Sequence, residues 1–369
     1  MENKIILFGA TGFTGGLTLK ALIKQGVRPF LLGRNVSKLK TISERYDGLD
    51  YAQADASNVG DIAGVLNIGD VLISTVGPFT RYGEAAVKAA IAKQAHYVDS
   101  TGEPGFIRKI FERYGAQAQR QGVTLLTAMG YDYVPGNMAA AVALSKASSA
   151  TRVDIGYFVS GGKPSASQGT QASVMQAMLE SGVYYSKGHL SEKMSQKKVR
   201  QFSIHGKKRP ASLVSGSEHL SLPISYPALQ EINTYLGWFG AASYIIPLGM
   251  VLHEYLFKVP GYKKCLAVML QKYNHSEGKG PDESERIHAQ TEVVAIAYDK
   301  QGKALSQATL CGVNPYDFTA NMLAWTAIKG LNAEFKITGA AGPVVALGFD
   351  ELLNGCKTAG LELESSVLK

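Results

Sequence analysis

A short apolar strand running into a glycine-rich turn is the feature of this chain that most constrains its fold. The strand is Lys4 to Phe8, and a helix is expected from Leu17 to Gln25. The turn between them contains Gly9, Ala10, Thr11, Gly12, Phe13, Thr14 and Gly15. Glycines at this spacing let the backbone approach a pyrophosphate, and the helix then directs its N-terminal N–H groups at the phosphates. The pattern favours a dinucleotide site, formed by these seven residues, over an ordinary tight turn.

The end of the second predicted strand bears on the choice of dinucleotide. Residues 30–34 form this strand, and Arg34 stands at its end, where NAD-binding folds usually carry an acidic residue. A guanidinium can bind the 2′-phosphate of NADP through two hydrogen bonds. We therefore expect NADP(H) rather than NAD(H), held by Arg34 with Ser37 and Lys38. The alternative is a surface arginine that ends a strand.

Two further strand ends complete the expected cofactor site. The third strand, 50–54, leads to Asp55, which either accepts a hydrogen bond from the adenine amino group or caps the helix expected near residue 58. The fourth strand, 70–76, ends in a loop expected to line the crevice for the nicotinamide half. The loop residues assigned to the cofactor are Thr75, Val76, Gly77 and Pro78.

The order of predicted elements sets the fold class. Strands and helices alternate through residue 130, which is typical of a doubly wound parallel sheet of the Rossmann type. Long strands at 288–299 and 304–313 instead indicate a mixed α+β domain with antiparallel strands. We expect an α/β protein with an NADP-binding domain, a substrate or dimerisation domain, and a C-terminal helix that returns to the first domain. These parts are residues 1–136, 137–335 and 336–369.

Composition narrows the functional class. Three widely spaced cysteines argue against a disulfide framework or a zinc motif and fit a reducing, cytoplasmic compartment. The seven histidines show no metal-ligand spacing, so no metal is expected. Much of the net charge of +8 comes from residues 187–209. Aromatic residues are not interleaved there as nucleic-acid binding requires, which leaves a solvated face or an attraction for acidic substrates.

Residues 232–252 carry no formal charge and are numerous enough to span a bilayer. Pro247 and internal glycines disfavour a straight spanning helix. The preferred interpretation is a buried helical hairpin, a lid over an apolar pocket or a dimer interface. The alternative is contact with a membrane surface, aided by Lys258, Lys263 and Lys264.

Four motifs together point to one family. They are the turn at 9–15, Val76-Gly77-Pro78-Phe79 followed by Tyr82-Gly83-Glu84, His96-Tyr97-Val98-Asp99-Ser100-Thr101-Gly102-Glu103, and Gly130-Tyr131-Asp132-Tyr133-Val134-Pro135-Gly136. As a set they resemble the saccharopine dehydrogenase family, and within it the saccharopine dehydrogenase-like oxidoreductases that include trans-acting enoyl reductases. The resemblance is close over 1–140 and looser beyond. It implies an NADP-binding Rossmann domain, a mixed second domain, frequent dimers, and dehydrogenase or reductase activity.

Hydride transfer needs orientation, a dry site and one proton source. Polar residues that follow the later strands are the catalytic candidates: Asp99, Glu103, Tyr131, Asp132 and Tyr133. A sheltered carboxyl group with a raised pKa could protonate a reduced double bond or a nitrogen. The alternative is that the aspartates cap loops and Tyr133 belongs to the core. No Tyr-x-x-x-Lys pair stands at a suitable place.

These observations predict an NADP(H)-dependent oxidoreductase that reduces a C=C, C=N or C=O bond. The resemblance does not fix the substrate, and the apolar segment favours a lipid-like or acyl substrate. We expect a homodimer, with contact at a membrane surface left open. Two alternatives remain, a non-catalytic NADP(H) sensor and a membrane-associated interaction protein.

Overall fold

The computed structural model describes residues 3–161, 167–177, 181–193, 198–262, 264–266, 268 and 280–366. The chain divides into two compact units. The first unit comprises Met1–Val134 and Pro315–Gly360, and the second comprises Pro135–Asn314 and Leu361–Lys369. The predicted partition differs in two places. Residues 315–335 pack within the first unit, and the last strand belongs to the second.

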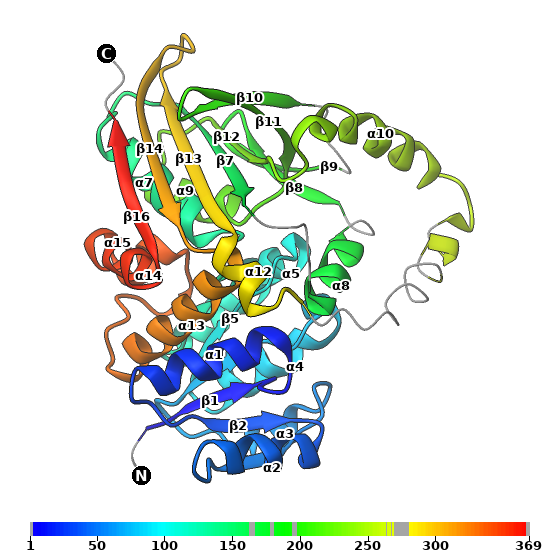
Figure 1. Cartoon of the computed structure of the whole chain (residues 1–369), viewed down its shortest axis with the longest axis vertical. Helices are drawn as coiled ribbons and strands as arrows, with labels where there is room; N and C mark the ends of the chain where they lie inside the picture. The colour runs from blue at the N-terminus through cyan, green and yellow to red at the C-terminus, as the bar shows by residue number, and fades with distance from the viewer. Residues whose placement is uncertain are drawn as a thin grey trace. The chain divides into compact units, whose positions relative to one another are not determined.

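The first unit is built on a seven-stranded sheet in which every pairing is parallel (Figure 1). Its strands are β1 (Ile5–Phe8), β2 (Phe30–Gly33), β3 (Tyr51–Gln53), β4 (Val71–Ser74), β5 (His96–Asp99), β6 (Thr124–Leu126) and β15 (Gly339–Ala340). The order β15-β6-β5-β4-β1-β2-β3 reverses direction between β1 and β4. This is the doubly wound arrangement, and it confirms the predicted Rossmann-type sheet.

Helices connect and cover these strands. They are α1 (Phe13–Lys24), α2 (Val36–Arg45), α3 (Val59–Ala63), α4 (Phe79–Ala92), α5 (Pro104–Lys109), the π-helical segment η1 (Ile110–Tyr114), α6 (Gly115–Arg120), α13 (Pro315–Leu331), α14 (Pro343–Leu347) and α15 (Phe349–Thr358). Helix α1 begins at Phe13 rather than at Leu17, so its first turn includes the last three residues of the glycine-rich stretch. The first residue of α1, Phe13, contacts α13. Its ring lies edge to face with that of Tyr316, and the ring centroids are 5.0 Å apart.

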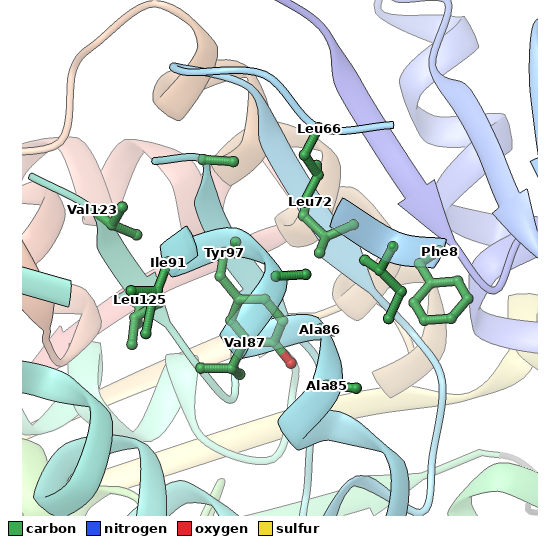
Figure 2. Close-up of a cluster of buried hydrophobic side chains, with 14 of the residues drawn as sticks. Phe8, Leu66, Leu72, Ala85, Ala86, Val87, Ile91, Tyr97, Val123 and Leu125 are labelled. Carbon is green, nitrogen blue, oxygen red and sulfur yellow. The ribbon is translucent and has the colours of Figure 1, made fainter. Parts of the chain in front are cut away.

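The core of the first unit lies between the sheet and α4. Figure 2 shows Phe8, Leu72, Tyr97 and Leu125 of the strands facing the alanine-rich helix. Because successive strand residues alternate between faces, a second layer of helices is needed on the other side. The strands β1, β2, β4, β5 and β6 are buried along nearly their whole length, whereas the edge strand β3 is partly exposed. The ends of the buried strands are therefore held in fixed positions.

The second unit contains a nine-stranded mixed sheet. Its strands are β7 (Arg152–Ser160), β8 (Gly182–Ser186), β9 (His189–Lys193), β10 (Val199–Ile204), β11 (Lys207–Val214), β12 (Glu231–Leu236), β13 (Gln290–Tyr298), β14 (Ala304–Gly312) and β16 (Leu361–Ser366). Its helices are α7 (Val134–Ser145), α8 (Gln168–Ala177), α9 (Glu218–Ser225), the 3₁₀ helix η2 (Gly240–Tyr244), α10 (Ile246–Leu256) and α12 (Glu283–His288). Among the described strands of this unit, only β12 and β7 pair in parallel, so the predicted mixed, antiparallel-rich domain is confirmed.

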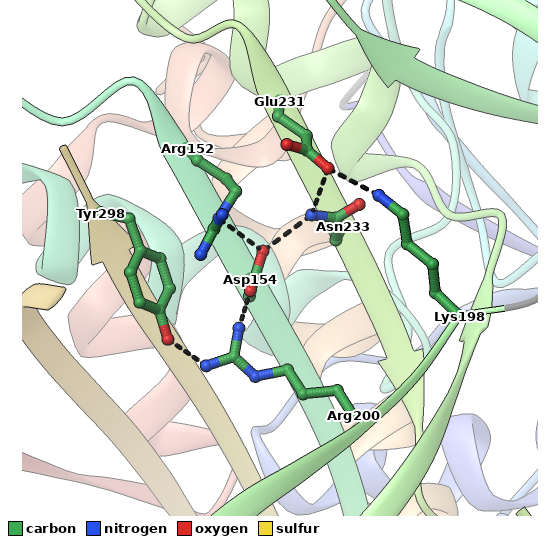
Figure 3. A network of polar contacts seen from close by, with 7 residues as sticks. All are labelled: Arg152, Asp154, Lys198, Arg200, Glu231, Asn233 and Tyr298. Atoms are coloured by element: carbon green, nitrogen blue, oxygen red, sulfur yellow. Dashed lines mark hydrogen bonds and ion pairs between the residues drawn. The ribbon is translucent and has the colours of Figure 1, made fainter. Parts of the chain in front are cut away.

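Part of the basic stretch at 187–209 is used inside the second unit. Arg200 forms an ion pair with the buried Asp154 and donates a hydrogen bond to the Tyr298 hydroxyl (Figure 3). Lys198 binds Glu231 at 2.8 Å. These basic residues therefore neutralise the sheet's own carboxylates, which reduces the charge left for an acidic partner.

The uncharged segment 232–252 is not one helix. Residues 232–236 belong to β12, a buried strand of the sheet. After a turn, the segment continues into η2 and then into the start of α10. The interpretation as a buried helical hairpin is wrong, because Tyr244 and Ile245 are exposed and residues 232–236 form a strand. Within the described residues, no helix combines the length and apolar character that crossing a membrane requires.

Candidate cofactor and active site

The predicted site residues follow strands of the parallel sheet. Because β1, β4, β5 and β6 are parallel neighbours, their carboxyl ends meet at one edge. The loops at this edge are 9–15, 75–78, 100–103 and 127–133. Ligands in open α/β sheets bind at this edge, next to the point where the strand order reverses.

The glycine turn has a geometry that other residues cannot adopt. Gly9 has a φ of +100°, and its carbonyl accepts a 2.9 Å hydrogen bond from the N–H of Gly12. A Cβ on Gly15 would lie 2.1 Å from the Gly9 carbonyl oxygen. A Cβ on Gly9 would lie 2.6 Å from Thr75 Oγ1. The turn therefore brings β1, β4 and α1 as close as their backbones allow.

The N-terminus of α1 fits an anionic group. Gly12 stands at the N-cap and has no side chain with which to satisfy the first N–H groups of the helix. The first turn of α1 contains no acidic residue, and Thr11 and Gly12 are exposed. The helix dipole and the N–H groups thus favour a phosphate at this position.

Arg34 and its neighbours lie together at the end of β2. Arg34, Ser37 and Lys38 are all exposed, and Asn35 caps α2 by accepting a 3.0 Å hydrogen bond from the backbone N–H of Lys38. The Asp55 carboxylate acts on Arg34 electrostatically, but in the described part of the chain no acidic side chain lies within ion-pair distance of the guanidinium. The guanidinium is thus available to an anion from solvent.

Asp55 lies at the end of β3 but does not cap α3. The N-cap is Asn58, whose side chain accepts from Gly60 and Asp61. The Asp55 carboxylate accepts from the hydroxyl and the N–H of Ser57, and these hydrogen bonds lower its pKa. Asp55 fixes a turn, and its proposed contact with adenine stays a prediction.

The loop after β4 is held against the glycine turn. The Thr75 hydroxyl donates a 3.1 Å hydrogen bond to the carbonyl of Phe8 at the end of β1. Residues Thr75 to Pro78 are each partly exposed, and the Gly77–Pro78 peptide is cis. The structure thus brings this loop beside the predicted pyrophosphate site.

Glu103 connects the loop after β5 to this loop. Its fully buried carboxylate accepts hydrogen bonds of 2.8 Å from the backbone N–H groups of Phe79 and Thr80. These N–H groups belong to the first turn of α4, whose N-cap, Pro78, cannot supply a side-chain acceptor. Glu103 therefore caps α4 from a distance and fixes the orientation of the loop that was predicted to line the nicotinamide.

Asp99 connects the loops after β5 and β6. Its buried carboxylate accepts from the N–H groups of Thr101 and Ala128, each at 2.9 Å, and from the Thr127 hydroxyl. Burial raises the pKa of Asp99 to about 6, although these hydrogen bonds oppose the shift. Ala128 has a φ of +62°, a strained conformation that these contacts hold in place.

Asp132 differs from the other candidates because its side chain is exposed. Protein atoms around the carboxyl nevertheless desolvate it and raise its pKa to about 6. Its Oδ2 lies 3.2 Å from where a Cβ on Gly102 would be. Among the described residues, none forms a hydrogen bond with this carboxyl. Asp132 is a solvent-accessible acid beside the end of β5.

The two tyrosines that flank Asp132 are buried. Tyr131 packs edge to face on Phe318 at 6.2 Å, and its N–H donates to the Thr319 hydroxyl. The Tyr133 hydroxyl donates to the carbonyl of Gly102 at 3.1 Å. Both side chains therefore hold the 130–133 loop against its neighbours.

The comparisons with known proteins agree with this geometry. Residues 5–126 match the family model described as the saccharopine dehydrogenase NADP binding domain. The match concerns this segment alone. The resemblance stated for the motifs is confirmed over this range, and so is the expectation of an NADP-binding domain.

The relatives of this NADP-binding domain carry two kinds of names. A lipid droplet localized protein of Caenorhabditis elegans is 32% identical over 146 residues, which are 36% of this chain and 34% of the relative. A trans-acting enoyl reductase of Mycobacterium ulcerans is 34% identical over 143 residues, 37% of this chain and 34% of the relative. The chain thus matches about a third of the length of these curated relatives.

One solved structure extends the similarity to the whole fold. A saccharopine dehydrogenase (L-Glu forming) from Saccharomyces cerevisiae superposes with a TM-score of 0.64 and 12% identity, covering 100% of both chains. At this identity the likeness concerns the fold alone. It supports the two-unit α/β architecture.

Sequence reasoning missed one group of side chains in the second unit. The ligand atoms of His205, Glu292 and Cys311 lie within 4.8 Å of one another. They come from distant segments, so no local spacing could have revealed them. The register of β13 and β14 is the signal, since it pairs Glu292 directly with Cys311.

Proposed function

We propose that this protein is an NADP(H)-dependent oxidoreductase that reduces a C=C, C=N or C=O bond. The observation that carries the proposal is the meeting of two features at one sheet edge. The glycine turn after β1 offers an anion site at the start of α1. Asp132 offers an accessible acid in the loop after β6, and β6 lies two strands away from β4 in the sheet. Its relatives include proteins named trans-acting enoyl reductase, which favours an acyl substrate with a C=C bond.

The cofactor is NADP(H) rather than NAD(H). The pyrophosphate binds at residues 9–15, and the 2′-phosphate binds Arg34 with Ser37 and Lys38. Support comes from the exposed guanidinium at the end of β2. When bound, NADPH supplies the hydride for the reduction.

The chain's own residues orient the reactants and supply a proton. Glu103 holds the loop of Thr75 to Pro78, which lines the nicotinamide side. Asp99 holds the loops after β5 and β6 in register. Asp132 donates the proton, since its pKa of about 6 keeps roughly a tenth of it protonated at pH 7. Asp99 and Glu103 are positioning residues.

Turnover tests the activity. The full chain is incubated with NADPH and a panel of enoyl thioesters, imines and carbonyl compounds of increasing chain length, and NADPH oxidation is followed by absorbance. We expect oxidation with at least one long-chain member and little with NADH. Tight NADPH binding without turnover across the panel would instead identify a non-catalytic sensor.

A second function, contact with a lipid surface, is favoured by the exposed apolar residues around α10. The exposed large side chains of this stretch are Phe239, Tyr244, Ile245, Leu252, Tyr255 and Val259. Glu254 is the sole acidic residue between positions 232 and 264, which also contain Lys258 and Lys264. An apolar surface with aromatic and basic side chains suits the interface of an anionic lipid layer. One relative is named for lipid droplets.

Vesicle flotation tests this contact. Binding to vesicles that contain anionic phospholipid is expected, and Ile245→Asp should abolish it. Ile287→Asp is the matched control, because both isoleucines are 70% exposed. Equal flotation of the two variants would contradict the proposal. If the same patch mediates the expected homodimer, Ile245→Asp will instead change the mass measured by light scattering.

A further inference from the structure

We propose that His205, Glu292 and Cys311 form a binding site for a zinc-like divalent cation in the second unit. The three side chains offer one imidazole nitrogen, one carboxylate oxygen and one sulfur, all within 4.8 Å of one another. Nitrogen, oxygen and sulfur together are the donor set that borderline metals such as Zn²⁺ prefer. The proposal is independent of the oxidoreductase activity.

The fold places two of the ligands by strand register. Glu292 of β13 and Cys311 of β14 are direct partners in an antiparallel pair, so both side chains project from the same face. Residues 294, 296 and 298 of β13 lie on this face too, and their side chains form an apolar cluster with Phe202 and Ile204 of β10. The carboxylate and the thiol therefore stand at the border of a packed core, where their positions are fixed.

The third ligand comes from the turn between β10 and β11. His205 follows Ile204, and its φ of +47° belongs to the tight turn that it forms with Gly206. Its Nε2 lies 3.0 Å from Glu292 Oε1. The packing of Ile204 into the apolar cluster brings this turn over β13.

Arg209 holds the Glu292 carboxylate in the orientation that a metal ligand needs. Its guanidinium forms an ion pair with Glu292 Oε2 and donates a 2.9 Å hydrogen bond to the carbonyl of Val159. One carboxylate oxygen is thereby held, and the other remains directed at His205. Outer contacts of this kind orient metal ligands in known sites.

The charges around the thiol favour a cation. Cys311 is half-buried, and the carboxylates of Glu364 and Glu292 lie close enough to act on its thiol electrostatically. A divalent cation between these groups would offset both carboxylates and stabilise the thiolate. On binding, the Cys311 Sγ–H bond breaks, an Sγ–metal bond forms, and the proton leaves to solvent. No oxidation occurs.

The site is accessible from solvent. The His205 side chain is 61% exposed, whereas that of Glu292 is 13% exposed. A cation can therefore enter past the imidazole and bind the two strand residues beneath it. Bound metal would fasten the β10–β11 turn to the β13–β14 pair.

Cobalt substitution tests the site, because Co²⁺ bonded to a thiolate gives a near-ultraviolet charge-transfer band. The full chain is stripped with a chelator and titrated with Co²⁺, and Zn²⁺ is then added. We expect the thiolate band to appear and to disappear when Zn²⁺ displaces Co²⁺. Cys311→Ser should remove the band, and His205→Gln should weaken Zn²⁺ binding at least about 10-fold, the loss seen even for outer partners of metal ligands.

Matched controls are Cys265→Ser and His189→Gln, which change exposed residues elsewhere in the second unit. Both should retain the band and the affinity for Zn²⁺. A spectrum without a thiolate band, or a band that survives Cys311→Ser, would overturn the proposal. In that case the three side chains are neighbours that share no cation.

Discussion

The Glu103 carboxylate accepts a 2.8 Å hydrogen bond from the backbone N–H of Phe79, across two neighbouring strand ends. Its other oxygen accepts from Thr80 at 2.8 Å. A carboxylate is needed because two donors converge on it from the start of α4, where the helix dipole also favours negative charge.

Glu103→Gln should destabilise the protein by about 1.5–3 kcal/mol, because the amide NH₂ faces a backbone donor and one charge-assisted hydrogen bond is lost. The free energy of unfolding, measured by denaturant titration, checks this. The exposed Glu112→Gln, at a position of the same unit that lacks this capping role, is the control and should change the value little. Equal effects would show that Glu103 does not cap α4.

Arg34→Asp should weaken NADPH binding about 10- to 100-fold, as expected for the loss of a charge-assisted contact with the 2′-phosphate. NADH binding should change much less. Fluorescence titrations with both nucleotides measure the ratio. Arg45→Asp makes the same charge change at the end of α2, away from the strand end, and controls for the overall potential. A similar loss for NADPH and NADH in Arg34→Asp would contradict the NADP(H) assignment.

Asp132→Asn should lower the single-turnover reduction rate about 10²- to 10⁴-fold, the usual contribution of a general acid. In the native protein the active form is the protonated acid, so the rate should fall about tenfold per pH unit above about 6. The variant should show no such decline. Asp99 titrates in the same range, so Asp99→Asn is the necessary comparison and should retain the decline. If Asp99→Asn loses it instead, the proton donor is Asp99.

Much of the fold followed from the sequence because strand periodicity and glycine positions are local signals. The glycine turn is one case, since its φ of +100° at Gly9 and its close approach to Thr75 need glycine. The motif Tyr82-Gly83-Glu84 is a second local signal. A Cβ on Gly83 would lie 2.5 Å from the Phe106 ring, and Glu84 binds Lys109 at 2.8 Å, which lowers the pKa of Glu84 to about 2.

The roles of the strand-end residues could not be predicted in the same way. Whether a buried carboxylate caps a helix or donates a proton depends on which N–H groups reach it, and for Glu103 these are Phe79 and Thr80, 24 and 23 residues away. The structure of the segment 232–252 was predicted wrongly for a similar reason. Its apolar residues belong partly to a buried strand and partly to an exposed surface, and composition does not separate the two.

The most direct measurement is NADPH binding by Gly15→Ala compared with Gly16→Ala. A Cβ at position 15 would lie 2.1 Å from the Gly9 carbonyl, whereas one at position 16 meets its nearest neighbour, the Ala10 carbonyl, at an ordinary 3.8 Å. Both variants add the same methyl group to consecutive residues of α1, and denaturation curves confirm that each is folded. We predict that Gly15→Ala binds NADPH at least about 100-fold more weakly than the native protein, about 2.7 kcal/mol, while Gly16→Ala binds it normally. Native affinity in folded Gly15→Ala would contradict the central claim that this turn holds the cofactor.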